Sequence, residues 1–203
     1  MKSITAEILL SRIRSAAVKH PEAPIDFKRA AVAMILQGTA SNEPDSLGSL
    51  RALFIQRSAY EKDPWSGHMA FPGGGVDPTD SDPLAAAMRE VDEEVGLILD
   101  RDELVGGIPE IRASARGQML NLQVYPFVFL KTGEVKLRLN QEVANTVWIP
   151  MDLILDESRH GKFMNHYKDK TVEMSCIEYE GYRIWGMTYR MIQNLIQLVR
   201  TQS

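Results

Sequence analysis

Runs of apolar residues between turn-forming residues predict most of the strands in this chain. Short continuous runs of this kind are typical of buried strands. The strands expected on this basis are 29–36, 51–56, 68–71, 120–130 and 145–149. Residues 135–139 (VKLRL) alternate between apolar and charged, which predicts a half-buried strand. Polar stretches over 37–47 and 61–66 predict loops.

Three segments have the apolar spacing of amphipathic helices. The N-terminal segment, about 3–19, has this spacing and predicts a helix docked on its own domain, although its basic residues also suit a mitochondrial presequence. The central helix is expected to begin at Pro83, after Asp82 as its N-cap, and to end at Gly96. A final helix is expected over 182–200.

The order of these elements favours an α/β fold of the α+β type. A helix is followed by several strands, a central helix, further strands and a closing helix, without regular strand–helix repetition. We therefore expect helices that cover a mixed sheet. The sequence has no internal repeat or clear linker, so residues 1–203 are expected to form one domain.

Composition and charge narrow the classes of partner. The formal net charge of -4 gives no overall attraction to nucleic acid or to an anionic membrane, and no apolar run approaches the roughly 18–20 residues that span a bilayer. Cys176 is the one cysteine, which excludes an internal disulfide and favours a reducing compartment, most simply the cytoplasm. A mitochondrion or another organelle is left open. Cys176 is expected to be buried, and His20 to lie at the surface.

Carboxylates crowd one part of the predicted central helix. Positions four apart lie one turn apart, so Glu90 and Glu94 project together with Glu93 beside them. Such like charges destabilise a helix by roughly 0.2–0.5 kcal/mol per pair, and a solvated acidic face is the simpler interpretation. Arg89 is spaced to pair with Glu93, and the preceding glycines let the backbone approach closely. Carboxylates without His or Cys clusters favour Mg²⁺ or Mn²⁺ and metal-dependent chemistry on a phosphorylated substrate.

The stretch 71–97 resembles the Nudix box. That motif is usually written as Gly, five residues, Glu, seven residues, then Arg-Glu-aliphatic-any-Glu-Glu-any-Gly-aliphatic. Residues 89–97 (REVDEEVGL) match its second half in full. In the first half, counted from Gly74, Asp80 stands where the motif has Glu, and the spacing to Arg89 is one residue longer. Together with the preceding FPGG, this departure resembles the coenzyme A pyrophosphatase branch of the Nudix hydrolases.

Further points of resemblance to this branch lie outside the box. They are Arg57-Ser58, Gly67, Glu142-Val143, Trp148-Ile149-Pro150 and the closing stretch 184–192. The segment 63–68 (DPWSGH) departs from the RSxxLRxHxGQ pattern that the branch usually has there. Trp65 and His68 are therefore positions where substrate preference could have diverged, and Trp65 is expected either to stack on substrate or to lie in the core.

The resemblance implies catalytic roles for residues of the central helix. Glu90 and Glu94 would be the principal metal ligands, and Glu93 would be a further ligand or the general base. Arg89 would orient Glu93. Glu142, on a later loop, is the other candidate for the base, with a solvated loop carboxylate as the alternative.

The resemblance also implies substrate contacts. Gly73 and Gly74, followed by Gly75, would bring backbone groups to the diphosphate, and Gly74 also to the metal. Arg57 would bind a phosphate bidentately, with a residue that simply ends a strand as the alternative. Asp80 has a shorter side chain than the Glu it replaces and is expected to have a structural role.

The fold and activity implied by the resemblance are those of a Nudix hydrolase. The fold would be an α/β/α sandwich with a mixed sheet and a central catalytic helix. The enzyme would be a pyrophosphatase dependent on Mg²⁺ or Mn²⁺ that acts on a small nucleoside diphosphate derivative. Coenzyme A or a derivative, split into 3′,5′-ADP and 4′-phosphopantetheine, is the first candidate. ADP-ribose, a nucleotide sugar or a dinucleotide is the alternative, and a ligand sensor without hydrolysis is the alternative outside enzymes. A homodimer is left open.

Overall fold

A mixed sheet lies at the centre of the computed structural model, which describes residues 4–38, 46–61, 65–115, 118–167 and 170–201. Neighbouring strands follow the order β3, β2, β1, β7 and β5. Their bounds are β3 (Met69–Ala70), β2 (Leu50–Arg57), β1 (Lys28–Gly38), β7 (Gln118–Lys131) and β5 (Leu104–Gly107). β1 and β7 run parallel, whereas the other pairs in this order are antiparallel.

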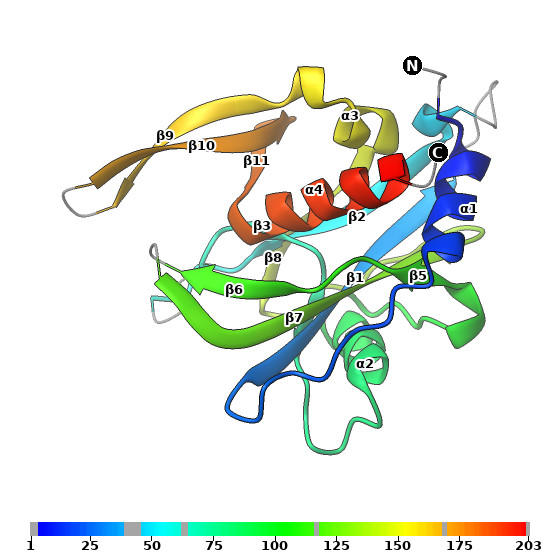
Figure 1. Ribbon diagram of the computed structural model, residues 1–203, viewed down its shortest axis with the longest axis horizontal. Coiled ribbons are helices and arrows are strands. Elements are labelled where there is room, and N and C mark those ends of the chain that lie inside the picture. Colours follow the sequence, from blue (N-terminus) through cyan, green and yellow to red (C-terminus); the bar gives the residue numbers. More distant parts are fainter. Residues whose placement is uncertain (1–3, 39–45, 62–64, 116–117, 168–169, 202–203) are drawn as a thin grey trace.

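Further strands extend this sheet and form a second one. β4 (Gly73–Gly75) pairs with β1, β6 (Ile111–Ala115) with β7, and β8 (Val143–Pro150) with β2. The smaller antiparallel sheet consists of β9 (Gly161–Tyr167), β10 (Lys170–Tyr179) and β11 (Tyr182–Trp185). The hairpin of β9 and β10 projects from the body of the molecule, while β11 contacts β3 (Figure 1).

Helices cover both faces of the central sheet. They are α1 (Ala6–Ala16), α2 (Pro83–Val95), α3 (Met151–Leu155) and α4 (Gly186–Thr201), with 3₁₀ turns at Leu47–Ser49, Arg101–Glu103 and Glu157–Arg159. α2 lies on one side of the sheet and α1 and α4 lie on the other (Figure 1). None of the helices in the described ranges is long and apolar enough to cross a membrane.

Two apolar clusters fill the spaces between the sheet and these helices. In the α1/α4 cluster, Leu9 and Leu195 pack with sheet residues such as Phe54. In the α2 cluster, Val91 packs with sheet residues such as Ile35. The layers are therefore those of the α/β/α sandwich that the resemblance implied, and this expectation is confirmed.

The strongest sequence patterns correspond to observed elements. The strands expected at 29–36, 51–56, 68–71, 120–130 and 145–149 appear as β1, β2, β3, β7 and β8. α1 lies inside the expected helix 3–19, and the Arg12 side chain donates to the carbonyl oxygen of Val199 in α4 at 2.7 Å. Most of the loop expected over 37–47 falls outside the described residues, and β1 itself continues to Gly38.

The strand expected over 135–139 is wrong. Val135 and Leu137 do pack against the α2 cluster, so the alternation in burial is present. The backbone, however, turns to the C-terminal end of α2, where helix carbonyl groups have no partner within the helix. The Arg138 N–H donates to the carbonyl oxygen of Val95 at 2.8 Å, and the Asn140 N–H donates to the carbonyl oxygen of Glu94 at 3.0 Å.

Two other expectations are corrected by the structure. Residues 182–185 form β11 and not the first turn of the last helix, because they pair with β10 and the chain changes direction at Gly186, where φ is 63°. His20 is not at the surface: its side chain is 10% exposed and its ring lies against those of Tyr125 and Phe127. Cys176 is buried, as expected.

Candidate functional site

The helix that carries the acidic residues is fixed at both ends. The Asp82 carboxylate accepts a hydrogen bond from the Ala85 N–H at 2.7 Å, and Pro83 occupies the first turn. At the other end Gly96 has the left-handed conformation, with φ of 64°, and its N–H donates to the Asp92 oxygen at 2.8 Å. The predicted helix and both its caps are confirmed.

The glycine strand β4 lies directly against the acidic side of α2. β4 pairs with β1, and the Gly73 N–H donates to a carboxylate oxygen of Glu94 at 2.8 Å. A Cβ atom on Gly74 would lie 2.5 Å from the carboxylate of Glu90. Only glycine leaves room for the Glu90 carboxylate at this point, so the backbone and the two carboxylates share one small space.

Gly73 is required for a different reason. Its φ is 146°, which side-chain-bearing residues rarely adopt, and a Cβ atom there would lie 2.3 Å from the carbonyl oxygen of Ala31. Because that neighbour is backbone in β1, it cannot move aside without disrupting the β1–β4 pairing. Gly73 therefore positions the strand, whereas Gly74 leaves room for the Glu90 side chain.

Burial dominates the electrostatics of the two carboxylates closest to β4. Glu94 is 2% exposed, and burial raises its pKa to about 7, although the bond from Gly73 and the charge of Arg57 act in the opposite direction. Burial also raises the pKa of Glu90, against the effect of the neighbouring Arg89. Glu142 adds a negative charge near both. A carboxylate pair of this kind would be stabilised in its ionised form by a cation.

Arg89 connects the helix to the loop that precedes it. Its guanidinium binds Asp80 through two hydrogen bonds of 3.1 and 3.0 Å, and the Asp80 side chain is 6% exposed. It also donates to Glu90 at 3.0 Å, to Glu93 at 3.2 Å and to the carbonyl oxygen of Gly75 at 3.0 Å. Asp80 lowers the mobility of Arg89 by this bidentate contact, and Arg89 in return lowers the pKa of Asp80.

The structural role expected for Asp80 therefore has a physical basis. A single oxygen of its carboxylate also accepts from the Asp77 N–H at 2.8 Å, which closes the loop before α2. The changed spacing between Asp80 and Arg89 is the one feature of the sequence that signals this contact. The pairing of Arg89 with Glu93, by contrast, was predicted from their spacing and is present.

Arg57 and Glu142 come to the same place from the ends of β2 and β8. Arg57 is paired in register with Val143, and the Ser58 N–H donates to the Glu142 carbonyl oxygen at 2.8 Å. The charges of Arg57 and Glu142 both act on Glu94. The predicted phosphate ligand and the second candidate base therefore lie near the carboxylates of α2.

Trp65 is held by protein contacts. Its indole N–H donates to the carbonyl oxygen of Ser114 at 3.3 Å, and its ring packs against the α1/α4 cluster. These contacts favour the core role among the two roles expected for it. Asp63 and Pro64, which belong to the same departing segment, lie outside the described residues.

The acidic residues have the oxygen donors that suit a divalent ion, although their side chains are not grouped closely enough to bind one in the present arrangement. Within the described ranges, no three His, Cys, Asp or Glu side chains are grouped so that they could hold a metal ion as they stand. Glu93 is exposed and turned to Arg89, while Glu94 is buried beneath Gly73. The half-buried Glu90 and the buried Glu94 nevertheless supply the hard oxygen donors that Mg²⁺ and Mn²⁺ prefer.

Comparison with known proteins identifies the family to which this site belongs. A family model described as NUDIX domain matches residues 28–167. The chain belongs to the NUDIX family. The expectation of a Nudix hydrolase that acts on pyrophosphate bonds of nucleoside diphosphate derivatives is confirmed. Members of the family generally use divalent metal ions.

Curated relatives cover nearly the whole chain. An uncharacterized Nudix hydrolase, NudL, from Shigella flexneri serotype 5b is 27% identical over 195 residues, 96% of this chain and 94% of the relative. The protein of the same description from Escherichia coli K12 is 26% identical over the same shares of the two chains.

Solved structures support the fold. A MutT/nudix family protein from Enterococcus faecalis aligns with a TM-score of 0.59 at 16% identity, over 91% of this chain and 66% of that one. The NUDIX domain of Shewanella oneidensis NrtR, complexed with ADP ribose, aligns with a TM-score of 0.53 at 16% identity, over 92% and 94%. At these identities the likeness establishes the fold alone.

Proposed function

We propose that the protein hydrolyses the diphosphate bond of coenzyme A or its derivatives, giving 3′,5′-ADP and 4′-phosphopantetheine. The observation that carries this proposal is the bidentate contact of Asp80 with Arg89. Asp80 and its changed spacing are the features that resemble the coenzyme A branch. Asp80 would orient Arg89 in the site, which would account for this departure from the usual box.

We further propose that Glu90 and Glu94 hold a divalent ion, Mg²⁺ or Mn²⁺, with Glu93 and the backbone of Gly74 as additional ligands. The support is chemical: burial raises the pKa of Glu90 and Glu94, and a cation would remove this penalty. When bound, the ion would polarise the diphosphate and lower the pKa of a water molecule.

The remaining groups would bind the substrate and move the proton. Arg57 would hold a phosphate of the diphosphate through paired N–H donors. Gly73 and Gly74 would let the diphosphate approach the backbone of β4 closely. Glu93 or Glu142, both exposed to solvent, would accept the proton of the attacking water.

A substrate panel with Mg²⁺ separates this proposal from its alternatives. Release of phosphopantetheine from coenzyme A supports it. Turnover of ADP-ribose, a nucleotide sugar or a dinucleotide, with coenzyme A intact, would contradict it and favour the second substrate class. That class is suggested by the departing segment 63–68 and by the NrtR domain, which is described as complexed with ADP ribose. Binding without turnover at any metal would favour a ligand sensor.

We propose that residues 1–203 form one Nudix hydrolase domain. α1 and α4 lie outside the matched residues 28–167, but they pack into the same cluster as the matched strands. The cytoplasm remains the compartment that Cys176 suggests, and a homodimer remains a prediction.

A further inference from the structure

An aromatic cluster borders the site just described. We name it the aromatic shelf and define it as His68, Phe163 and Trp185. The His68 and Trp185 rings lie 4.5 Å apart between centroids at an interplanar angle of 49°, and Phe163 meets Trp185 edge-on at 5.4 Å. All three residues are half-buried.

Strand register places the shelf next to the predicted phosphate ligand. β2 and β3 are antiparallel, with Gln56 opposite Met69, and the Arg57 N–H donates to the His68 carbonyl oxygen at 3.0 Å. His68 is therefore directly opposite Arg57, and side chains of opposite residues emerge on the same face of a sheet. Arg57 also acts electrostatically on Glu94. The shelf therefore begins at the residue opposite Arg57, beside the groups that are predicted to surround the diphosphate.

The smaller sheet divides its aromatic residues between two faces. Phe163 is opposite Met174, and Trp185 is opposite Cys176, so both rings lie on one face of the sheet. On the other face Tyr179 and Tyr182 pack against the α1/α4 cluster. The two tyrosines are thus packed against the core, whereas Trp185 lies against both His68 and Phe163.

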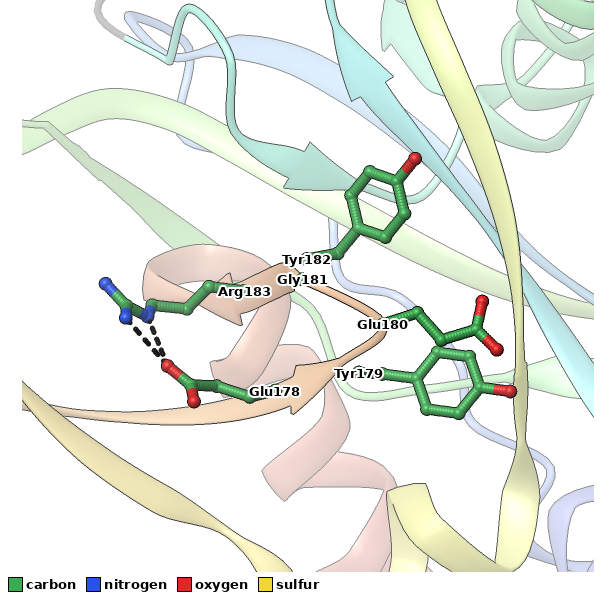
Figure 2. A pocket seen from close by; sticks show the side chains of 6 residues that line it. All are labelled: Glu178, Tyr179, Glu180, Gly181, Tyr182 and Arg183. Atoms are coloured by element: carbon green, nitrogen blue, oxygen red, sulfur yellow. Dashed lines mark hydrogen bonds and ion pairs between the residues drawn. The ribbon is translucent and has the colours of Figure 1, made fainter.

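An ion pair next to the β10–β11 turn supports the shelf from the outer side. The Arg183 guanidinium lies 4.4 Å from the centre of the Phe163 ring and binds Glu178 at 2.7 Å. Figure 2 shows Arg183 and Glu178 on one side of the turn and the side chains of Tyr179 and Tyr182 directed away from them. This contact fixes Phe163 against the edge of Trp185.

We propose that the aromatic shelf binds the purine base of the nucleotide half of the substrate by stacking, with Trp185 as the principal base-binding residue. The proposal deepens the proposed function and rests on it for the nature of the substrate. Nucleobases stack on aromatic side chains through their π-faces. Arg57, which lies opposite His68, would hold the diphosphate. The diphosphate of a bound nucleotide would then lie at the carboxylates and its base at the shelf. Trp185 lies beyond residues 28–167, in a part of the chain that the family model does not match.

The test compares Trp185→Leu with Tyr179→Leu, a matched loss of an aromatic ring from the other face of the same sheet. Binding of AMP and of inorganic pyrophosphate is measured by calorimetry with Mg²⁺ present. We expect Trp185→Leu to weaken AMP binding by about tenfold or more and to leave pyrophosphate binding unchanged. Tyr179→Leu should alter neither, and Trp185→Phe should restore most of the AMP affinity. With the preferred substrate, Trp185→Leu should raise KM and leave kcat unchanged.

Wild-type AMP affinity in Trp185→Leu would overturn the proposal, and so would an equal loss of AMP and pyrophosphate binding. Circular dichroism establishes that each variant is folded. If Trp185→Leu is not folded, His68→Ala, which removes the ring next to Trp185, carries the test: it should weaken AMP binding and leave pyrophosphate binding unchanged, and wild-type AMP affinity in this variant would overturn the proposal. The outcome is separable from that of the proposed function. If coenzyme A is not hydrolysed but AMP binding depends on Trp185, the shelf stands and the substrate assignment fails.

Discussion

Replacing Gly74 with alanine should remove activity while the fold is retained. A Cβ atom at this position would lie 2.5 Å from the Glu90 carboxylate, whereas ordinary contacts begin at 3.4 Å. The carboxylate must therefore move by roughly 1 Å, and a displacement of about 1 Å in a site can cost on the order of 100-fold in rate. Because the displaced group is the end of a flexible side chain, the backbone need not move.

The control for this experiment is the next residue in the strand. A Cβ atom on Gly75 meets nothing within 4 Å, so Gly75→Ala should keep wild-type kcat. Both variants should unfold within a few degrees of wild type, since a tolerated Gly→Ala change alters stability by only about 0.4–1 kcal/mol. Steady-state hydrolysis and thermal unfolding measure the two effects. Wild-type kcat in Gly74→Ala, or an equal loss in both variants, would refute the assignment of Glu90 to the reacting centre.

Other positions give predictions for stability and pH. Gly73→Ala should lower the free energy of unfolding by about 3 kcal/mol or more, because its Cβ meets the backbone of β1 and its φ is 146°; denaturant titration measures this, and a near-neutral result would contradict it. Asp80→Asn should cost about 2 kcal/mol, or roughly 4–8 °C in Tm, and the loss should disappear in an Arg89→Gln background if the contact between the two is its cause. Burial lowers the pKa of His20, partly against the effect of Glu110, so the neutral ring is favoured in the folded state. His20 therefore contributes stability that is complete above the unfolded-state pKa of 6.5 and is lost as the pH falls below it; unfolding of His20→Gln should depend less on pH in that range, and an unchanged pH dependence would count against the buried neutral ring.

Sequence reasoning succeeded where local chemistry determines structure. The helix 83–95 was predicted from Asp82, Pro83 and Gly96, because caps act within one turn of a helix end. The pairing of Arg89 with Glu93 follows from helical spacing in the same way.

Predictions failed where the partner of a segment is distant along the chain. The alternation at 135–139 does bury one side, but its backbone partner is a helix end and not a strand. Strands β5, β6, β9 and β10 were not predicted, since their residues form no strong apolar run. The contact of His68 with Trp185 joins the residue before β3 to a residue of β11 in the other sheet, and no local pattern marks it.

Under the proposed function, α2 and β4 form a site for hydrolysis of the diphosphate in coenzyme A. The most direct test is the rate of phosphopantetheine release from coenzyme A with Mg²⁺, for wild type, Glu94→Gln and Asp92→Asn. Asp92 is an exposed carboxylate of the same helix and serves as the matched control. We expect release of 3′,5′-ADP and 4′-phosphopantetheine in equal amounts, a rate lower by about 100-fold or more in Glu94→Gln, and an unchanged rate in Asp92→Asn. Absence of these products with wild type, or an unchanged rate in Glu94→Gln, would contradict the proposed function.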